Sequence, residues 1–351
     1  MINISINKEQ FSDLLNLHYG VFYPLKNFVN YNQFKNILTS QRINNKIFFP
    51  LPIFFGIDKI NFNKIKNQEY LKLFYKKNFL FLIKIKDIFQ IDSNIIGKKI
   101  FGKNFEKHPY FIKHIKKNFA YLDFEYKKLN KQKIKNKNFI SPQELKFKIK
   151  NKKTLAGFHT RNVPHAAHQW AHIYMIKKYK NILIQPLVGQ YKKNEYLDDV
   201  IIKSNKIVVK MYKQNKAFYA PYFSYPRYGG PLEAALHAIV RKNYGCSHFW
   251  VGRDHAGFKN FYQKYSSQNF CKKNEKKLGI KIITQREPYF CLSCRKITNK
   301  KCFKKSCKNS KKKMISGTII RNLLKKNKKI PEYLMHRDIS KLLNNKSILD
   351  H

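Results

Sequence analysis

The stretch Thr154–His172, TLAGFHTRNVPHAAHQWAH, joins a short apolar segment, a polar turn and a helix-forming run. Leu155–Phe158 predicts a buried strand, and Ala166–Tyr174 predicts a helix. A helix that follows a strand through a polar turn presents the backbone N–H groups of its first turn and the positive end of its dipole. The stretch therefore predicts an anion-binding site at a helix N-terminus.

The side chains of this turn add hydrogen-bond donors. They are a guanidinium, an amide and two imidazoles, from Arg161, Asn162, His165 and His168. The histidines are three residues apart and share one helix face. A metal pair is an alternative, but the region holds no acidic residue as a further ligand, and phosphate contact fits better. Either histidine alone would be interpreted as a surface or capping residue.

Alternating apolar strands and amphipathic helices predict an α/β domain with a doubly wound parallel sheet. The elements expected after the opening stretch are strands at 181–189 and 248–252 and helices at 199–212 and 232–244. The strand at 181–189 is continuously apolar, as expected for a parallel strand covered on both faces. Ligands of such sheets bind at the carboxyl ends of the strands. The predicted polar turns at those ends are 159–168, 189–195 and 252–257.

The predicted domains are an N-terminal β-rich accessory domain at 1–140, a catalytic α/β domain at 141–314 with a Cys-rich loop at 291–307, and a short C-terminal helical segment at 315–351. Strands are expected at 47–57 and 79–85, and C-terminal helices at 318–328 and 337–345. Ser141, Pro142 and Glu144 predict a capping box that starts a helix reaching about Lys150.

The formal net charge of +52 would ordinarily indicate a nucleic-acid or polyanion binder. Only nine of the 72 basic residues are Arg, and the Lys are spread along the whole chain, which favours compositional drift over a binding stripe. Polyanion binding remains an alternative function. The N-terminus lacks the apolar core of a signal peptide, and no apolar run could span a bilayer, so we expect a soluble, cytoplasmic protein with no membrane partner.

The rare arginines gather in motifs, although lysine could replace them wherever only charge matters. Arg161 lies in the opening turn and Arg227 in RYGGPLE. Arg253 belongs to Gly252–Gly257, GRDHAG, and Arg321 to ISGTIIR. A guanidinium binds oxyanions through a planar two-pronged fork. Alone, GRDHAG is a weak to moderate signal, because a tight turn would account for it. ISGTIIR alone is a weak signal, because a helix cap would account for it.

Together the four motifs resemble the ATP sulfurylase (sulfate adenylyltransferase) family, in its single-chain bacterial type. They are TRN-x-x-H-x-x-H, RY-x-GP-x-E, GRDHAG and ISGT-x-x-R, in that order. GVFYPL at 20–25 and EKHP at 106–109 are also similar to that family. The resemblance covers nearly the whole chain and implies a PUA-like N-terminal domain, a central nucleotidyltransferase domain and homo-oligomers.

The resemblance implies that sulfate attacks the α-phosphorus of MgATP directly, giving adenylyl sulfate (APS) and pyrophosphate. The implied catalytic residues are Arg161, Asn162, His165, His168 and Arg253. The implied substrate-binding residues are His159, Thr160, Arg227, Gly252, Asp254, His255, Ala256, Gly257 and Arg321. His159 stands where the family commonly has Gln. Mg²⁺ is expected to arrive with ATP, and no specific nucleic acid is expected. A related nucleotidyltransferase with another acceptor, and the reverse reaction in sulfur oxidation, remain open.

The cysteines Cys291, Cys294, Cys302 and Cys307 could supply four thiolates to a structural Zn²⁺. Free thiols in a Lys-rich loop are a second interpretation, and a redox CxxC pair is a third. Some bacterial members of the family that the chain resembles carry zinc at this place.

Overall fold

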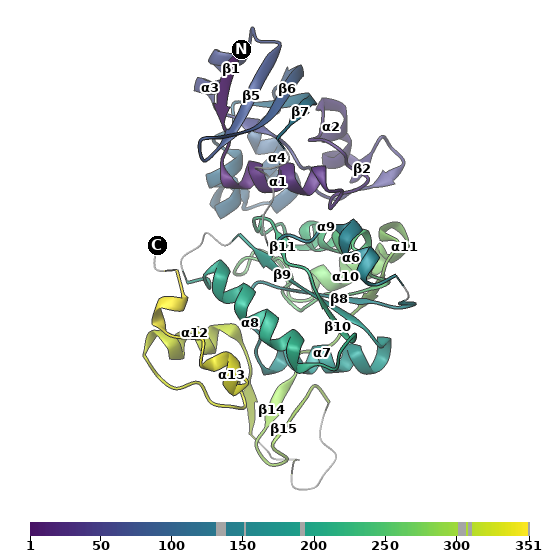
Figure 1. Ribbon diagram of the computed structural model, residues 1–351, viewed down its shortest axis with the longest axis vertical. Coiled ribbons are helices and arrows are strands. Elements are labelled where there is room, and N and C mark those ends of the chain that lie inside the picture. Colours follow the sequence, from purple (N-terminus) through teal and green to yellow (C-terminus); the bar gives the residue numbers. More distant parts are fainter. Residues whose placement is uncertain (131–137, 151, 190–193, 301–306, 308–310, 350–351) are drawn as a thin grey trace. The chain divides into compact units, whose positions relative to one another are not determined.

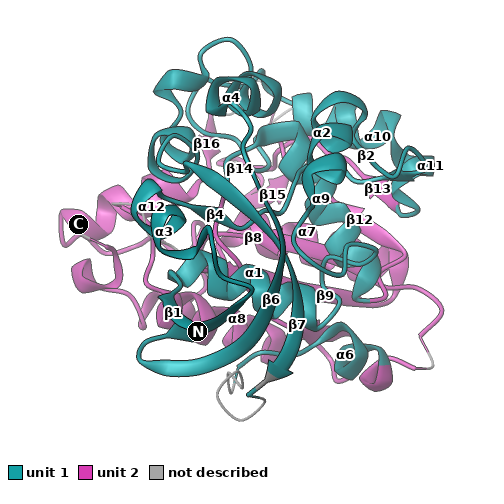
Figure 2. Ribbon diagram, turned by 90° about the horizontal axis from the view of Figure 1, so that it is seen from above, with its two compact units in different colours: residues 1–146, 227–244, 254–280 teal, residues 147–226, 245–253, 281–351 magenta. Residues whose placement is uncertain are grey.

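The computed structural model describes residues 1–130, 138–150, 152–189, 194–300, 307 and 311–349. These residues divide into two compact units, which Figure 2 colours separately. Unit 1 comprises residues 1–146, 227–244 and 254–280, and unit 2 comprises residues 147–226, 245–253 and 281–351. Each unit therefore collects segments that are distant in the sequence.

Unit 1 contains a five-stranded, mainly antiparallel sheet with the order β1-β5-β6-β7-β4. Its strands are β1 (Ile2–Ser5), β4 (Gly56–Ile57), β5 (Tyr70–Tyr75), β6 (Asn78–Phe89) and β7 (Ala120–Leu129). Its helices include α1 (Lys8–His18), α2 (Tyr31–Ser40), α3 (Lys59–Ile65), α4 (Ser93–Phe101), α9 (Gly230–Asn243), α10 (Ser266–Lys273) and α11 (Glu275–Leu278). The β-rich N-terminal fold is confirmed.

Two local predictions in this region have different outcomes. The strand expected at 79–85 lies within β6. The single strand expected at 47–57 is wrong, because only β3 (Ile47–Phe48) and β4 are extended there. Pro50 and Pro52 lie between these two short strands. Proline has no backbone N–H to donate to a ladder, so a continuous strand is disfavoured.

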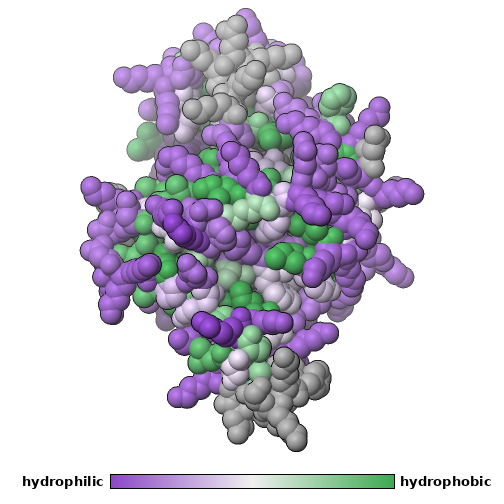
Figure 3. All heavy atoms as spheres, turned by 60° about the horizontal axis from the view of Figure 1, so that its bottom comes forward, coloured by the Kyte–Doolittle hydropathy of each residue, from purple (hydrophilic) through white to green (hydrophobic). Residues whose placement is uncertain are grey.

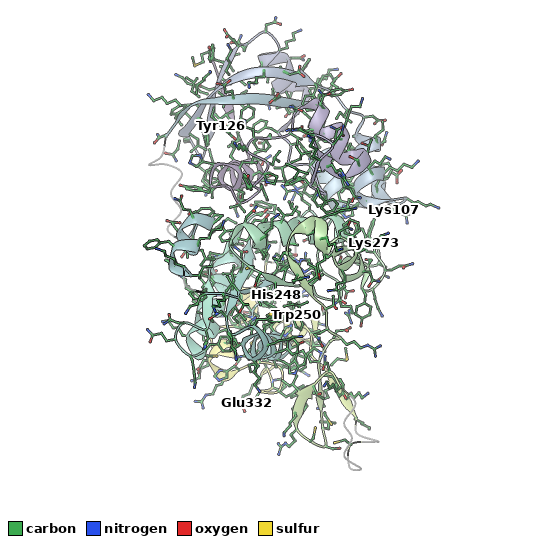
Figure 4. The ribbon with its side chains drawn as sticks, turned by 90° about the vertical axis from the view of Figure 1, so that its right-hand side faces the viewer. Lys107, Tyr126, His248, Trp250, Lys273 and Glu332 are labelled. Atoms are coloured by element: carbon green, nitrogen blue, oxygen red, sulfur yellow. The ribbon has the colours of Figure 1, made fainter. Side chains whose placement is uncertain are left out.

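The sheet of unit 2 is parallel and has the order β10-β9-β8-β12-β13, with β11 pairing to β9. Its strands are β8 (Ala156–Thr160), β9 (Ile182–Val188), β10 (Ala217–Tyr219), β11 (Tyr222–Phe223), β12 (His248–Trp250) and β13 (Lys281–Ile283). Every residue of β9 is buried, as its continuous apolar run predicted. Figure 1 shows α7 (Ala166–Tyr179) and α8 (Asp198–Met211) running along this sheet. Figure 4 labels His248 and Trp250 on β12.

The strand order reverses direction at β8. The chain runs outward through β9 to β10 on one side and then through β12 to β13 on the other. This is the arrangement of a doubly wound sheet, so the predicted fold class is confirmed. The place where the order reverses is the usual ligand crevice of such sheets.

The C-terminal residues pack into the same core as the sheet of unit 2. A three-stranded antiparallel sheet, β15-β14-β16, precedes them, with β14 (Tyr289–Cys291), β15 (Lys296–Thr298) and β16 (Lys312–Met314). The α12 helix (Gly317–Lys325) buries Ile320 and Leu324 in one cluster with Phe158. The last segment thus helps to hold the strand–turn–helix stretch.

Predicted helix boundaries hold in part. The capping box at Ser141 and Glu144 is present, and α6 (Pro142–Lys148) follows it. The helix expected at 337–345 is wrong in length, because α13 ends at Ser340. Asn344 begins a separate turn, since its side chain bonds to Ser347. Asparagine side chains that bond nearby groups favour turns over helix interiors.

Among the described residues, no helix is long and apolar enough to cross a membrane. Figure 3 shows a face on which hydrophilic side chains predominate, with smaller hydrophobic areas between them. This surface agrees with the net charge of +52.

Candidate functional site

The residues that follow β8 and β12 lie at the switch point of the parallel sheet. The two strands are neighbours, and Trp250 pairs with Phe158 in their register. Arg161 follows the last residue of β8, and Arg253 follows β12 after two intervening residues. Because the carboxyl ends of parallel strands meet at one edge, the sheet brings the loops that carry both arginines together.

The turn after β8 is held by side chains. Thr160 Oγ1 accepts a hydrogen bond from the backbone N–H of Asn162 over 3.0 Å. Asn162 Oδ1 in turn accepts one from Arg321 Nη1 over 2.8 Å. Arg321 lies in α12, whose N-cap Ser316 accepts from the backbone N–H of Ile319. Two of the predicted motifs, 159 residues apart in the sequence, therefore meet.

Gly317 makes this meeting possible. A Cβ atom at this position would lie 3.0 Å from Asn162 Oδ1 and 3.1 Å from Arg321 Nη1. Both distances are tighter than ordinary van der Waals contacts, so a side chain here would push the amide and the guanidinium apart. The close packing of Asn162 and Arg321 therefore explains why the ISGT motif has glycine at this position.

His165 is the N-cap residue of α7, and the capping hydrogen bond determines which of its ring nitrogens carries the proton. Its Nδ1 accepts from the backbone N–H of His168 over 3.4 Å. A neutral imidazole has one donor and one acceptor nitrogen, so its proton must be on Nε2. The rings of His165 and His168 stack with centroids 3.7 Å apart. His165 can therefore donate from Nε2 at a helix N-terminus.

The histidines of α7 are neutral near pH 7. Burial lowers the pKa of His165 to about 4 and that of His172 to about 3. Burial, with smaller contributions from His165 and His172, also lowers the pKa of His168 well below its ordinary value. His172 Nδ1 lies 3.0 Å from the Tyr212 hydroxyl. These imidazoles can offer N–H donors to an anion but carry little positive charge.

Two glutamates that the sequence did not single out accompany the arginines of unit 2. Glu287 Oε1 lies 2.6 Å from Arg253 Nη1, and both side chains are about one-third exposed. Glu195 Oε1 lies 3.8 Å from Arg161 Nη1. The rarity of acidic residues could have drawn attention to these glutamates, because the whole chain has only 20 acidic residues. The predicted loop at 189–195 is only partly described, since 190–193 lie outside the described residues.

Residues 254–257, which directly follow Arg253, and Arg227 belong to unit 1. Residues 254–257 form a turn in which the Gly257 N–H donates to the Asp254 carbonyl over 3.1 Å, with Ala256 at φ 56°. Arg227 is 4% exposed, and its Nη2 lies 2.5 Å from Asp13 Oδ2. Burial raises the pKa of Asp13 to about 6, although the Arg227 charge opposes this. The guanidinium of Arg227 therefore has a buried carboxylate partner.

Three of the four predicted zinc ligands converge, and Cys302 lies outside the described residues. The Sγ atoms of Cys291, Cys294 and Cys307 lie within 4.8 Å of one another, and those of Cys291 and Cys307 are 3.8 Å apart. Tetrahedral zinc with Zn–S bonds of about 2.3 Å places its sulfur atoms about 3.8 Å apart. The thiols therefore fit a tetrahedral metal.

Comparisons with known proteins found similar chains and matching family models. A model described as ATP-sulfurylase matches residues 136–346, and a PUA-like domain model matches residues 1–123. A sulfate adenylyltransferase of Ignicoccus hospitalis is 30% identical, over 98% of this chain and 90% of its own length. One of Pyrococcus abyssi is 30% identical, over 97% of this chain and 89% of its own length.

A similar solved structure is the hexameric APS kinase from Thiobacillus denitrificans, with a TM-score of 0.75 and 16% identity. The similarity covers 97% of this chain and 62% of the length of that structure. At this identity the likeness concerns the fold.

Proposed function

We infer that this chain, which belongs to the ATP-sulfurylase family, works at the switch point between β8 and β12. It is a nucleotidyltransferase that converts ATP and sulfate to APS and pyrophosphate. What we propose is the assignment of its residues. The single observation that carries the assignment is the bond from Arg321 to Asn162, because it joins two anion-binding motifs beside the switch point.

The proposed step is a direct displacement. A sulfate oxygen forms a bond to the α-phosphorus while the bond from that phosphorus to the bridging oxygen of the β-phosphate breaks, and pyrophosphate leaves with the electron pair. The sulfate dianion has no proton to lose, so no general base is required. Catalysis then consists of positioning and charge stabilisation, to which neutral donors contribute as well as cations.

The roles follow from the chemistry of each group. Arg161 and Arg253 hold sulfate and the phosphoryl charge as guanidinium forks. Asn162, oriented by Arg321, places its amide at the α-phosphate. His165, through Nε2–H, and His168 donate to the departing pyrophosphate at the N-terminus of α7. Mg²⁺ bound to ATP would neutralise phosphate charge.

Residues with less structural support keep the roles that the family resemblance implies. Gly252 fits close ligand approach, because a Cβ atom there would meet no protein atom within 4 Å. The other substrate-binding assignments of this kind are His159, Thr160, Arg227, Asp254, His255, Ala256 and Gly257. A cytoplasmic location and a homo-oligomer also remain proposals.

We also propose a structural zinc ion, held by Cys291, Cys294 and Cys307 with Cys302 as the fourth ligand. The distance between the sulfurs of Cys291 and Cys307 supports it. Bound metal would fix the β14–β15 turn through thiolate bonds. Cys291 ends β14, so this tether holds the small sheet whose third strand leads into the ISGT motif.

The test is pyrophosphate release from MgATP, measured with sulfate, with molybdate and with neither. We expect release only with an acceptor, and exchange of labelled pyrophosphate into ATP only when sulfate is present. Exchange without sulfate would indicate a covalent adenylyl-enzyme and contradict direct attack. Absent turnover in folded protein, together with tight salt-sensitive DNA binding, would favour the polyanion-binding alternative.

A further inference from the structure

His237 is a buried histidine of unit 1 whose two ring nitrogens both have neighbours. It lies on α9, and its Nδ1 is 3.0 Å from His255 Nε2 in the GRDHAG turn. Its Nε2 is 3.6 Å from Oε1 of Glu233, one helical turn earlier. The side chains of His237 and Glu233 are 3% and 2% exposed. The Glu233 carboxylate, the His237 imidazole and the His255 imidazole therefore form a buried chain of neighbouring groups.

The Glu233 carboxylate is fixed at the start of α9. Its Oε1 accepts from the backbone N–H of Arg227 and its Oε2 from that of Gly229, each over 2.9 Å. Both bonds favour the ionised carboxylate. A negative charge held beside Nε2 of His237 favours a proton on that nitrogen. Neutral His237 then has Nδ1 as its acceptor.

The protonation of His237 determines which of the two facing ring nitrogens carries the proton between His237 and His255. At 3.0 Å one nitrogen must donate and the other must accept, because two N–H groups or two lone pairs facing each other would repel. With Nδ1 of His237 accepting, Nε2 of His255 carries the proton. Nδ1 of neutral His255 is then an acceptor, and an acceptor cannot hold an oxyanion.

The backbone of the turn is tied to the same unit. The His255 carbonyl accepts from Ser267 Oγ over 2.8 Å, and the Ala256 carbonyl accepts from the Gly230 N–H over 3.0 Å. Ser267 lies on α10 and Gly230 begins α9. The turn that directly follows Arg253 is therefore tied to α9 and α10 by these two bonds and to α9 also by the histidine pair.

We propose that His237 is a positioning residue, which keeps the proton of His255 on Nε2 and so fixes the GRDHAG turn. The His255 ring then orients the turn and does not donate to sulfate, which is left to Arg253. The substrate-binding role assigned to His255 is thereby limited to its backbone and to ligand groups that donate to its Nδ1. This inference deepens the proposed function and rests on it only where it concerns turnover. The tautomer itself does not depend on any activity.

The test is two-bond ¹H–¹⁵N correlation NMR at pH 8 on the full chain with ¹⁵N-labelled histidine. The His255 signals are identified by their loss in His255→Asn. We expect His255 to be protonated on Nε2 alone. The His237→Leu substitution removes the acceptor and should give His255 a mixed tautomer. The His237→Asn substitution can accept at the place of Nδ1 and should keep the parent pattern.

Turnover is the second readout. We expect His237→Leu to lower kcat about tenfold or more, because a small displacement of a positioning turn lowers the rate steeply, and His237→Asn to restore most of it. His18→Asn, an exposed histidine of the same unit, should change neither readout. A His255 proton on Nδ1 in the parent would overturn the proposal, whether or not His237→Leu folds. An unchanged tautomer in folded His237→Leu would also overturn it. Failure of sulfate-dependent turnover with the expected tautomer would count against the proposed function alone.

Discussion

Arg321 donates a hydrogen bond from Nη1 to Oδ1 of Asn162 over 2.8 Å, and this bond joins a common helix-start motif to the loop after β8. Asn162 belongs to the loop after the central strand β8, and Arg321 belongs to a helix near the C-terminus. An amide whose oxygen is bound by a guanidinium points its NH₂ group the other way. The pair therefore presents donors to an anion with little freedom to reorient.

The Arg321→Lys substitution tests this relationship. Lysine keeps the charge but lacks the planar fork that can reach the amide and a second acceptor together. We expect kcat/KM to fall about 100-fold, in the range for loss of one preorganised donor, with an unchanged thermal midpoint. Arg337→Lys, at an exposed arginine of α13, is the matched control and should be silent. Equal activity of the two variants would remove Arg321 from the site.

Two glycine substitutions separate packing from ligand approach. The Gly317→Ala substitution should disturb Asn162 and Arg321, because the new methyl group would lie 3.0–3.1 Å from both side chains.

The Gly252→Ala substitution meets no protein atom within 4 Å, so the melting temperature should stay within about 2 °C of the parent value. Its activity should nevertheless fall about tenfold or more, because a ligand would occupy that space. A fully active Gly252→Ala protein would show that no substrate approaches this loop closely.

Stability should fall in mild acid because of the buried histidines. The unfolded chain protonates histidine near pH 6.5, whereas His165 and His172 have pKa values of about 4 and 3 when folded. Between these values the unfolded state binds more protons, so the free energy of unfolding decreases as pH falls from 6.5 to 4. The carboxyl of Asp13, with its pKa raised to about 6, acts in the opposite direction.

A comparison of variants isolates the histidine effect. The His172→Phe substitution should lower stability at pH 7.5, through loss of the Tyr212 contact, but should reduce the loss between pH 6.5 and 4 by on the order of 1 kcal/mol. Urea unfolding at both ends of this range measures it. His336→Gln, at an exposed histidine, is the control. An identical pH dependence in His172→Phe would mean that this imidazole does not remain neutral in the folded protein.

Protein purified without chelator should contain about one zinc per chain by elemental analysis. The Cys307→Ser substitution should lower the zinc content severalfold and the thermal midpoint by several degrees, since a structural metal contributes to folding. Cys246→Ala, at a cysteine outside the cluster, should keep its zinc. Protein without zinc, or Cys307→Ser with full zinc content, would leave the cluster as free thiols.

The sequence predicted the local structure around the proposed site well. The strand, turn and helix at Thr154–His172 follow from short-range periodicity and from a cap within the same stretch. The order of strands and helices also predicted the parallel sheet, because such connections permit few topologies. The segment 47–57 shows the limit of such predictions. One strand was predicted there from the apolar residues, although its two prolines divide the segment into two short strands.

Long-range partners could not be predicted in the same way. The bond from Arg321 to Asn162 and the pair formed by Arg253 and Glu287 depend on which loops the tertiary fold brings together. Arg227 illustrates the same point, because its motif did not indicate that its guanidinium would meet Asp13 of the first helix. Side-chain direction is decided by packing, which residue spacing does not encode.

The most direct test of the residue assignment is sulfate-dependent pyrophosphate release by Arg253→Ala beside Arg286→Ala. Arg253 follows β12, Arg286 follows the neighbouring strand β13, and Arg286 is exposed. We expect Arg253→Ala to lose at least about 100-fold in kcat/KM for sulfate with an unchanged thermal midpoint, while Arg286→Ala stays within about twofold of the parent. Near-normal turnover of folded Arg253→Ala would contradict the placement of sulfate at the end of β12.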